Sequence, residues 1–304
     1  MPLGKNAAPV KEEIKNSKIT KSKTMRWQGR RQSDNVEDRR GSRTPLAIGG
    51  GLGAIVMVVL YLIMGGDPNE VLQQVSQQPA SEITKFSARE QELAAFTKVV
   101  LADTEDVWDS VYQAMNDRYE QPRLVLFSGS TSSECGFASA ASGPFYCPPD
   151  KRIYIDLSFF DELQQKFEVE GEFAMAYVIA HEVGHHIQQL MGTTTKLQQM
   201  RQGISEIAYN KLSVQLELQA DFLAGVWAHH AQKLKNILEE GDIASALDAA
   251  NAIGDDRLQQ SAGRTVNPDA FTHGTSKQRV YWFKKGFETG DISQGNTFAT
   301  TELQ

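Results

Sequence analysis

The order of apolar and polar positions divides the chain into five parts. The first 45 residues are mostly polar, the next 19 are uncharged, and regular amphipathic patterns begin only at Ser87. From these patterns and the turn formers between them we predict five regions. They are a polar head without stable structure over 1–45, an apolar segment over 46–64, a linker over 65–86, a folded domain over 87–290 and a tail over 291–304.

The folded domain combines helical patterns with two short β-rich runs. Ser87 and Glu90 form a capping box before the periodic run "ELAAFTKVVL", and a second helix is predicted over Glu105–Tyr119. The runs "PRLVLFSG" and "KRIYIDLS" are short, β-rich and bounded by turn residues. From Asp161 onward the patterns are helical almost to the end. Strands early and helices late predict an α+β domain that is mostly helical with a small sheet.

The uncharged segment Leu46–Met64 predicts one transmembrane helix. Its 19 residues would span about 28 Å, close to the thickness of a bilayer core. A buried soluble helix and a cleaved signal peptide are the alternatives, but five apolar turns and a long charged lead-in disfavour them. Residues 1–45 carry 12 Lys and Arg against 5 Asp and Glu, a balance of +7, which leaves −14 for the rest of a chain of net charge −7. The positive-inside rule then predicts a cytoplasmic head and an exported domain.

The two cysteines, Cys135 and Cys147, both fall on the predicted exported side. Disulfides persist in oxidising compartments, so we predict a bridge between them. A loop of this length would add about 3 kcal/mol of stability. Two buried free cysteines are the alternative, and two thiols alone cannot complete a zinc site.

The segment "GEFAMAYVIAHEVGHHIQQL" contains the motif H-E-x-x-H, from His181 to His185. On a helix, positions i and i+4 differ by about 40°, so both imidazoles can share a Zn²⁺, and Glu182 can reach a water on the same metal. Residues 173–180 are all apolar, which predicts a buried helix where uncompensated polar groups are costly. Two hydrogen-bonded core histidines are the alternative. His186 is turned about 100° from its neighbour and is predicted to pack at the flank of the helix.

A third ligand is predicted in the later segment "ELQADFLAG". A catalytic zinc takes three protein ligands and a water, and the extended zincin pattern with a third histidine after the motif is absent. Glu217 and Asp221 stand at i and i+4, and small residues on the same stripe, including Gly225, would let this helix approach the first one at Gly184. We predict Glu217 as the ligand and Asp221 as the acceptor that orients a ligand histidine. Exchanged roles, Glu206 as the ligand, or a solvated helix face remain open.

These groups fit the hydrolysis of a peptide bond. Zinc lowers the pKa of its bound water towards about 7 and polarises a carbonyl, while Glu182 takes the water's proton and passes it to the leaving nitrogen. A donor for the tetrahedral oxyanion is also needed. His273, before a helix predicted to be capped by Ser276, is one candidate, and His229 or His230 are others. The runs "RLVLF" or "RIYIDL" would provide a sheet edge for the substrate.

Five segments together resemble the bacterial neutral zinc metallopeptidase family, a membrane-anchored group. They are "MRWQGRRQSDNVEDRRG", "GPFYCPPDKRIYIDLSFF", "AYVIAHEVGHHIQ", "LELQADFLAG" and "THGTSKQRVYWF". The resemblance covers about residues 25–290. It implies a zincin-like catalytic domain whose metal ligands match His181, His185 and Glu217, with Glu182 as the catalytic acid/base.

The combined prediction is a membrane-anchored zinc peptidase of the bacterial cytoplasmic membrane. We expect a peptide or protein substrate and the membrane as partners, and no nucleic acid. One alternative is a non-enzymatic envelope assembly module in which zinc only joins two helices. An acid beside the ligands and only three protein ligands favour catalysis over such a structural site. Another alternative is a zinc amidase acting on cell-wall peptides, which would use the same chemistry.

Overall fold

A small four-stranded sheet forms one layer of the fold. The computed structural model describes residues 25–41 and 86–299. The strands are β1 (Val36–Asp38), β2 (Arg123–Phe127), β5 (Phe145–Cys147) and β6 (Arg152–Asp156), in the order β1-β2-β6-β5. Strands β1, β2 and β6 run parallel, and β5 is antiparallel to β6. The two predicted strands are therefore confirmed as β2 and β6, and both are buried after their first residue, as interior strands require.

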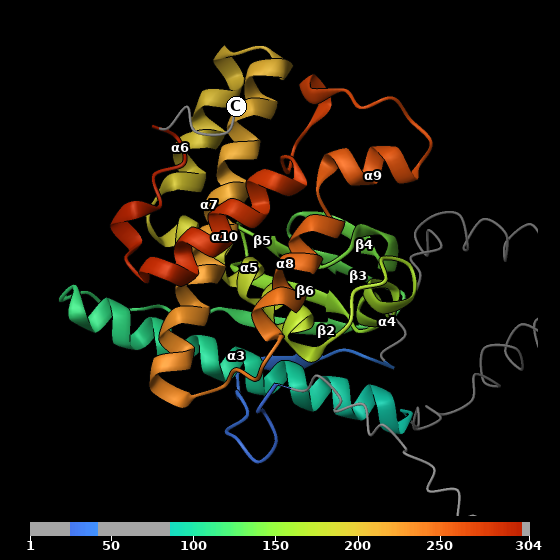
Figure 1. The fold of residues 1–304 in the computed structure, drawn as a ribbon, viewed down its shortest axis with the longest axis vertical. Coiled ribbons are helices and arrows are strands. Elements are labelled where there is room, and N and C mark those ends of the chain that lie inside the picture. The colour runs from blue at the N-terminus through green and yellow to red at the C-terminus, as the bar shows by residue number, and fades with distance from the viewer. Residues whose placement is uncertain (1–24, 42–85, 300–304) are drawn as a thin grey trace, which may run out of the picture.

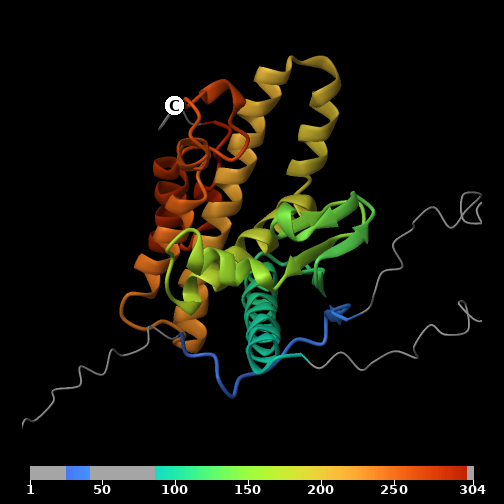
Figure 2. The same ribbon diagram turned by 90° about the vertical axis from the view of Figure 1, so that its right-hand side faces the viewer.

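Helices make up most of the described chain. They are α3 (Ala88–Ala114), α4 (Ser158–Gln165), α5 (Glu172–Leu190), α6 (Thr193–Met200), α7 (Glu206–Lys235), α8 (Asp242–Ala252), α9 (Asp255–Ser261) and α10 (Ser276–Thr289). Helix α5 lies between the sheet and the paired helices α7 and α10 (Figure 1, Figure 2). The capping box of Ser87 and Glu90 is present, whereas α10 is capped by Thr275 instead of the predicted Ser276. The prediction of a mostly helical α+β fold with a small sheet is confirmed.

The first helical region is one helix, where the sequence predicted two. Helix α3 continues through Asp103 and Glu105, which are both only 1 % exposed. Each of these carboxylates has a partner outside the helix, since Asp103 pairs with Arg30 and Glu105 accepts a hydrogen bond from Asn35. A buried carboxylate with such partners is compatible with a continuous helix, so the polar run "DTED" does not end it.

Residues 25–41 fold onto the domain, so the prediction of an unstructured head is wrong for them. Met25 and Trp27 lie in the main hydrophobic core, and β1 pairs with β2. The segment is polar, but its arginines meet carboxylates that are buried on α3. The rest of the head, the predicted membrane span over 46–64 and the linker lie outside the described residues. Within the described ranges, no helix is long and apolar enough to cross a membrane.

The predicted disulfide between Cys135 and Cys147 is present, with the two Cα atoms 5.8 Å apart. It joins β5 to the turn between β3 (Ser130–Ser133) and β4 (Gly136–Ser139), which form a two-stranded hairpin. Strand β5 is an edge of the main sheet. The prediction that "RLVLF" or "RIYIDL" offers an edge to a substrate is wrong, because β2 and β6 each pair on both sides.

Helix α7 packs closely against both α5 and α10. A Cβ on Gly184 of α5 would lie 2.9 Å from the carbonyl oxygen of Ala220 on α7, so the predicted notch is confirmed. Gly225 of α7 was predicted to face α5. Instead it lies against the backbone of Phe283 on α10. These close approaches fix the spacing of the three helices, because any side chain larger than hydrogen would separate them.

The first residues of the predicted tail also pack on α7. The side-chain amide of Gln219 donates to the carbonyl of Gly295 at 2.9 Å. Thr297 is 3 % exposed and donates its hydroxyl to the carbonyl of Gln215 at 2.6 Å. The folded domain therefore continues past residue 290.

Candidate metal centre

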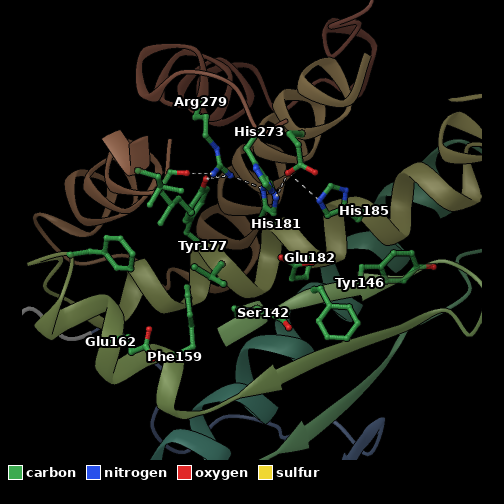
Figure 3. A pocket seen from close by; sticks show the side chains of 18 of the residues that line it. Ser142, Tyr146, Phe159, Glu162, Tyr177, His181, Glu182, His185, His273 and Arg279 are labelled. Atoms are coloured by element: carbon green, nitrogen blue, oxygen red, sulfur yellow. Dashed lines mark hydrogen bonds and ion pairs between the residues drawn. The ribbon is translucent and has the colours of Figure 1, made fainter. Parts of the chain in front are cut away.

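The two histidines of the H-E-x-x-H motif project from one face of α5. The apolar residues 173–180 before them are buried in the core, which fixes the position of the helix. The rings of His181 and His185 lie with their centroids 4.8 Å apart, as expected for positions i and i+4. Glu182 is 7 % exposed and lines the same cavity as the two imidazoles (Figure 3).

Helix α7 brings Glu217 to the two histidines. Its Oε2 atom lies 3.2 Å from Nε2 of His181 and 3.5 Å from Nε2 of His185. One ligand atom from each residue lies within 4.8 Å of the other two. Two imidazoles and one carboxylate at this spacing fit a Zn²⁺ with bonds of about 2 Å. In the described part of the chain these are the residues that group as a possible metal site, and neither Asp221 nor Glu206 belongs to the group.

Asp221 orients His181 from the side away from Glu217. Its Oδ1 atom lies 2.9 Å from Nδ1 of His181 and accepts a hydrogen bond from the hydroxyl of Tyr177 at 2.5 Å. Arg279 of α10, only 2 % exposed, binds the same carboxylate through Nε at 2.8 Å and Nη2 at 3.0 Å. With Nδ1 engaged by Asp221, Nε2 of His181 is left to face Glu217. The sequence motifs indicated Asp221 but not Arg279 or Tyr177.

His185 is oriented by the buried amide of Gln188. Oε1 of Gln188 lies 2.8 Å from Nδ1 of His185, and its Nε2 donates to the carbonyl of Leu216 at 2.6 Å and to Oε1 of Gln219 at 3.2 Å. Because the amide nitrogen is engaged with acceptors, the amide oxygen accepts from Nδ1–H, and Nε2 of His185 faces Glu217. Sequence reasoning missed this role, although a polar residue three positions after a ligand histidine on a buried helix is a detectable signal.

The electrostatics of the site favour positive charge between the ligands. Burial lowers the pKa of His181, but Asp221 and Glu217 outweigh burial and raise this pKa to about 10. Burial opposes the ionised form of Glu217, but His185 and His181 hold its pKa well below the usual value. Burial likewise opposes ionisation of Asp221, yet Arg279 and His181 lower its pKa to about 2. Both carboxylates therefore stay ionised, and a cation between the imidazoles is stabilised.

A cavity of about 490 Å³ opens in front of the ligand cluster (Figure 3). Phe145 and Tyr146 of the edge strand β5 line one part of it. Further apolar walls come from Phe159 of α4, from Phe167 just after the end of α4, and from Leu258 of α9. A mostly apolar cavity with a few convergent polar groups is typical of a binding or active site.

His273 lines the same cavity, in the loop that precedes α10 (Figure 3). Asp255 organises this loop, because its Oδ2 atom accepts the backbone N–H groups of residues 272–274 at 2.8, 2.6 and 3.0 Å. Its Oδ1 atom lies 3.4 Å from Nδ1 of His273. Asp255 thus holds the imidazole at the cavity, and its role was missed because it lies 18 residues away in sequence. Oxyanion stabilisation by His273 stays a prediction.

The remaining histidines have structural partners. His229 and His230 bind backbone carbonyls at the C-terminal end of α10, at 2.7 and 2.8 Å, and neither lines the cavity. They are therefore unsuited to the oxyanion role considered for them. His186 is fully buried, with Nδ1 3.1 Å from the hydroxyl of Tyr146 and Nε2 2.6 Å from the carbonyl of Glu120. Its predicted place at the flank of the helix is confirmed.

Fold and site together define an α+β domain with a candidate metal centre of two histidines and one carboxylate built on two helices. A family model described as "Putative neutral zinc metallopeptidase" matches residues 25–298. The chain therefore belongs to this family, as its motifs indicated. The description of the family also supports zinc as the metal.

Two relatives illustrate the reach of this similarity. The chain is 48 % identical over 284 residues to the uncharacterized protein YpfJ of Escherichia coli K12, covering 90 % of this chain and 99 % of that protein. It is 39 % identical over 257 residues to the uncharacterized protein Rv2575 of Mycobacterium tuberculosis H37Rv, covering 80 % of this chain and 86 % of that protein. No solved structure matches the chain, so the zincin-like character of the fold stays a prediction.

Proposed function

We propose that this chain is a zinc-dependent peptidase. The observation that carries the proposal is the convergence of ligand atoms from His181, His185 and Glu217 at a cavity that Glu182 also lines. A structural zinc usually takes four protein ligands and requires no acid beside them. Three ligands in the described part of the chain, with an acid next to them, favour a catalytic site, and the family description supports the same class of enzyme.

The side chains around the cavity have complementary roles in this proposal. Zn²⁺ bound by the three ligands would supply a Lewis acid that acidifies water and polarises the scissile carbonyl. Glu182 lines the cavity next to the ligands but does not belong to the ligand cluster. Because its carboxylate is not needed to hold the metal, it can accept the proton of the attacking water and deliver it to the leaving nitrogen. His273, held by Asp255, donates a hydrogen bond to the oxygen that becomes negatively charged in the transition state.

An extended peptide is the substrate shape that the cavity favours. Strand β5 pairs with β6 on one side, and among the described strands nothing pairs with its other side. An exposed strand edge can accept a further strand through backbone hydrogen bonds. Phe145 and Tyr146 of this strand line the cavity, and Phe159 and Phe167 offer apolar contacts to substrate side chains. Amide bonds of cell-wall peptides would be hydrolysed by the same groups.

We also propose that the domain works outside the cytoplasm, at the cytoplasmic membrane. The disulfide between Cys135 and Cys147 supports an oxidising compartment. The uncharged stretch over 46–64 supports attachment to a bilayer.

The sharpest test of the mechanism compares wild type with Glu182→Gln. Zinc content and cleavage are measured on purified full-length protein, with a peptide library that includes cell-wall peptides. We expect zinc to stay bound and cleavage to fall by about 10²–10⁴-fold, the usual contribution of a general acid/base. Glu206→Gln is the matched control, because Glu206 is exposed in the first turn of α7. Equal cleavage by Glu182→Gln and wild type would refute the mechanism, and no cleavage by any variant would favour a non-enzymatic module.

Two further variants separate the other roles. Glu217→Ala is expected to lose zinc, and retention at full occupancy would move the third ligand elsewhere. His273→Gln is expected to keep zinc and the melting temperature while kcat falls by about 10²–10³-fold, as for removal of an oxyanion donor. An unchanged kcat in His273→Gln would remove His273 from the proposed mechanism.

A further inference from the structure

The cavity at the candidate metal centre extends well beyond the ligands. Its volume is about 490 Å³, whereas a water molecule takes about 30 Å³ in the liquid, so a metal and its water would fill only a small part of it. Figure 3 shows Phe159 and Glu162 of α4 on one side of the view, and His185 and Tyr146 on the other. The rest of the cavity is space for a substrate.

The part of the cavity beside α4 has apolar walls, which we call the apolar pocket. Val178 is one turn before Glu182 on α5, so these walls begin next to the acid. Three of the wall residues are half-buried and pack against the main hydrophobic core, which holds them in place. The members of the apolar pocket are Phe159, Phe167, Val178, Ile253 and Leu258.

The apolar pocket favours an apolar occupant. Leu258 is 37 % exposed although its side chain is apolar, and apolar groups gain free energy when a ligand removes them from water. A charged occupant would lose its water without gaining a partner, which is costly. Glu162 and Lys166, the charged side chains that line this part of the cavity, are both exposed to solvent. A large apolar side chain therefore suits the pocket best.

The backbone beside the pocket indicates how a peptide would pass it. A Cβ on Gly143 would lie 3.8 Å from the Phe159 ring, and β5 begins two residues later, at Phe145. A peptide that pairs with the edge of β5 left open by the described strands therefore passes the pocket as well as the metal centre. Alternate side chains of a strand point to the same side, so one side chain of the peptide faces the pocket.

The charges near the metal centre do not suit the free end of a peptide. A terminal carboxylate is usually bound by a cation such as arginine. Arg279 lines the cavity, but its Nε and Nη2 atoms bind Asp221, and its Nη1 atom donates to the carbonyl of Ile253 at 3.2 Å. Among the described residues that line the cavity, Lys166 is the other Lys or Arg, and it lies exposed at the C-terminal end of α4. This charge distribution favours a chain that continues through the cavity.

We propose that the cavity takes an internal stretch of an extended polypeptide and holds a large apolar side chain in the apolar pocket, beside the bond that is cleaved. The enzyme is then an endopeptidase that selects large apolar residues. This selectivity rests on the proposed peptidase function, but binding to the pocket can be measured without cleavage.

Binding is measured with purified, zinc-loaded, full-length Glu182→Gln. The probes are peptides of Gly, Ser and Ala with acetylated and amidated ends, which carry Phe, Ala, Asp or Arg at one central position. We expect the Phe peptide to bind about 10–100-fold more tightly than the Ala peptide, because an aromatic side chain is buried, and the Asp peptide to bind more weakly than either. Equal affinities of the Phe and Ala peptides would overturn the proposal.

A second variant, Leu258→Glu, tests the pocket itself. Because Leu258 is partly exposed, its replacement does not open the core. In the Glu182→Gln background, we expect it to lower the ratio of Phe to Ala affinity and to raise the affinity for the Arg peptide. Leu234→Glu is the matched control, because Leu234 is 54 % exposed and lies outside the cavity lining. The ratio does not depend on the folded fraction, so an unchanged ratio in Leu258→Glu would overturn the pocket assignment.

Cleavage of the same blocked peptides by the wild type separates this proposal from the proposed function. We expect kcat/KM to be about 10–100-fold higher for the Phe peptide than for the Ala peptide. Cleavage without this preference, or cleavage only of peptides with a free end, would overturn the proposal while the peptidase function stands. Binding that prefers Phe without any cleavage would refute the peptidase function and leave the pocket assignment in place.

Discussion

We expect the candidate metal centre to depend on how closely α5 and α7 approach at Gly184, and Gly184→Ala tests this dependence. The added Cβ would lie 2.9 Å from the carbonyl oxygen of Ala220, whereas ordinary contacts begin at 3.4 Å, so the helices would separate by 3.4 − 2.9, about 0.5 Å. Functional sites tolerate displacements of about that size before they weaken. Because the proposed zinc ligands sit on both helices, with Glu217 one turn before Ala220, we expect the dissociation constant for zinc to rise about tenfold, or about 1.4 kcal/mol.

The stability of this variant should change by an amount similar to the change in zinc affinity. Overpacking costs about 1–3 kcal/mol, and alanine in place of glycine returns about 1 kcal/mol of helix propensity. The free energy of unfolding of the zinc-free protein is therefore expected to fall by about 0–2 kcal/mol. Zinc affinity is measured by competition with a chelating dye, and stability by denaturant unfolding. Gly203→Ala is the control, because nothing lies within 4 Å of its Cβ position. A wild-type zinc affinity in Gly184→Ala would refute the link between helix spacing and metal binding.

Three other predictions follow from single contacts. Gln188→Leu is expected to weaken zinc binding by about 10–100-fold, because His185 loses the acceptor that orients it, and an unchanged affinity would contradict that role. Burial lowers the pKa of His186, so its folded pKa lies below the unfolded value of about 6.5. The stability that it contributes is present above that value and is lost as the pH falls. His186→Gln should therefore reduce the loss of unfolding free energy between about pH 7 and pH 5. The unfolding free energy is measured by urea titration at each pH, and an equal loss in His186→Gln and wild type would argue against this. Reduction of the Cys135–Cys147 bridge should lower the free energy of unfolding by about 3 kcal/mol, and identical unfolding curves with and without reductant would refute it.

The parts of the site that follow local geometry could be read from the sequence. His181 and His185 share a face because of helical periodicity, and the apolar run before them indicates burial. Glu217 and Asp221 could be found in the same way, as acids at i and i+4 among apolar neighbours. The rule that a ligand histidine is oriented by an acceptor allowed distinct roles to be predicted for them, with exchanged roles left open. The structure places both acids beside His181.

The parts that depend on long-range contacts could not be read. Arg279 reaches Asp221 from 58 residues away, and Asp255 reaches His273 from 18 residues away. The separation of such a pair along the sequence does not distinguish it from charged residues that lie apart on the surface. The segment 25–41 was misjudged for a similar reason. Its strand is only three residues long, too short to show alternation, and its arginines resemble a solvated tail until the buried acids of α3 are known.

The charge balance of the site explains why Arg279 matters for the chemistry. When the two imidazoles bind a metal they are neutral, so the ligand set carries a single negative charge, that of Glu217. A dication on these ligands would therefore retain a net positive charge, which would polarise a carbonyl and acidify water. Asp221 lies 2.9 Å from His181 and would reduce that positive charge if it were unpaired. Arg279 binds both oxygens of Asp221 in a buried environment and offsets its charge. Asp221 can thus orient His181 as a hydrogen-bond acceptor without weakening the electrostatic effect on which the proposed hydrolysis would depend.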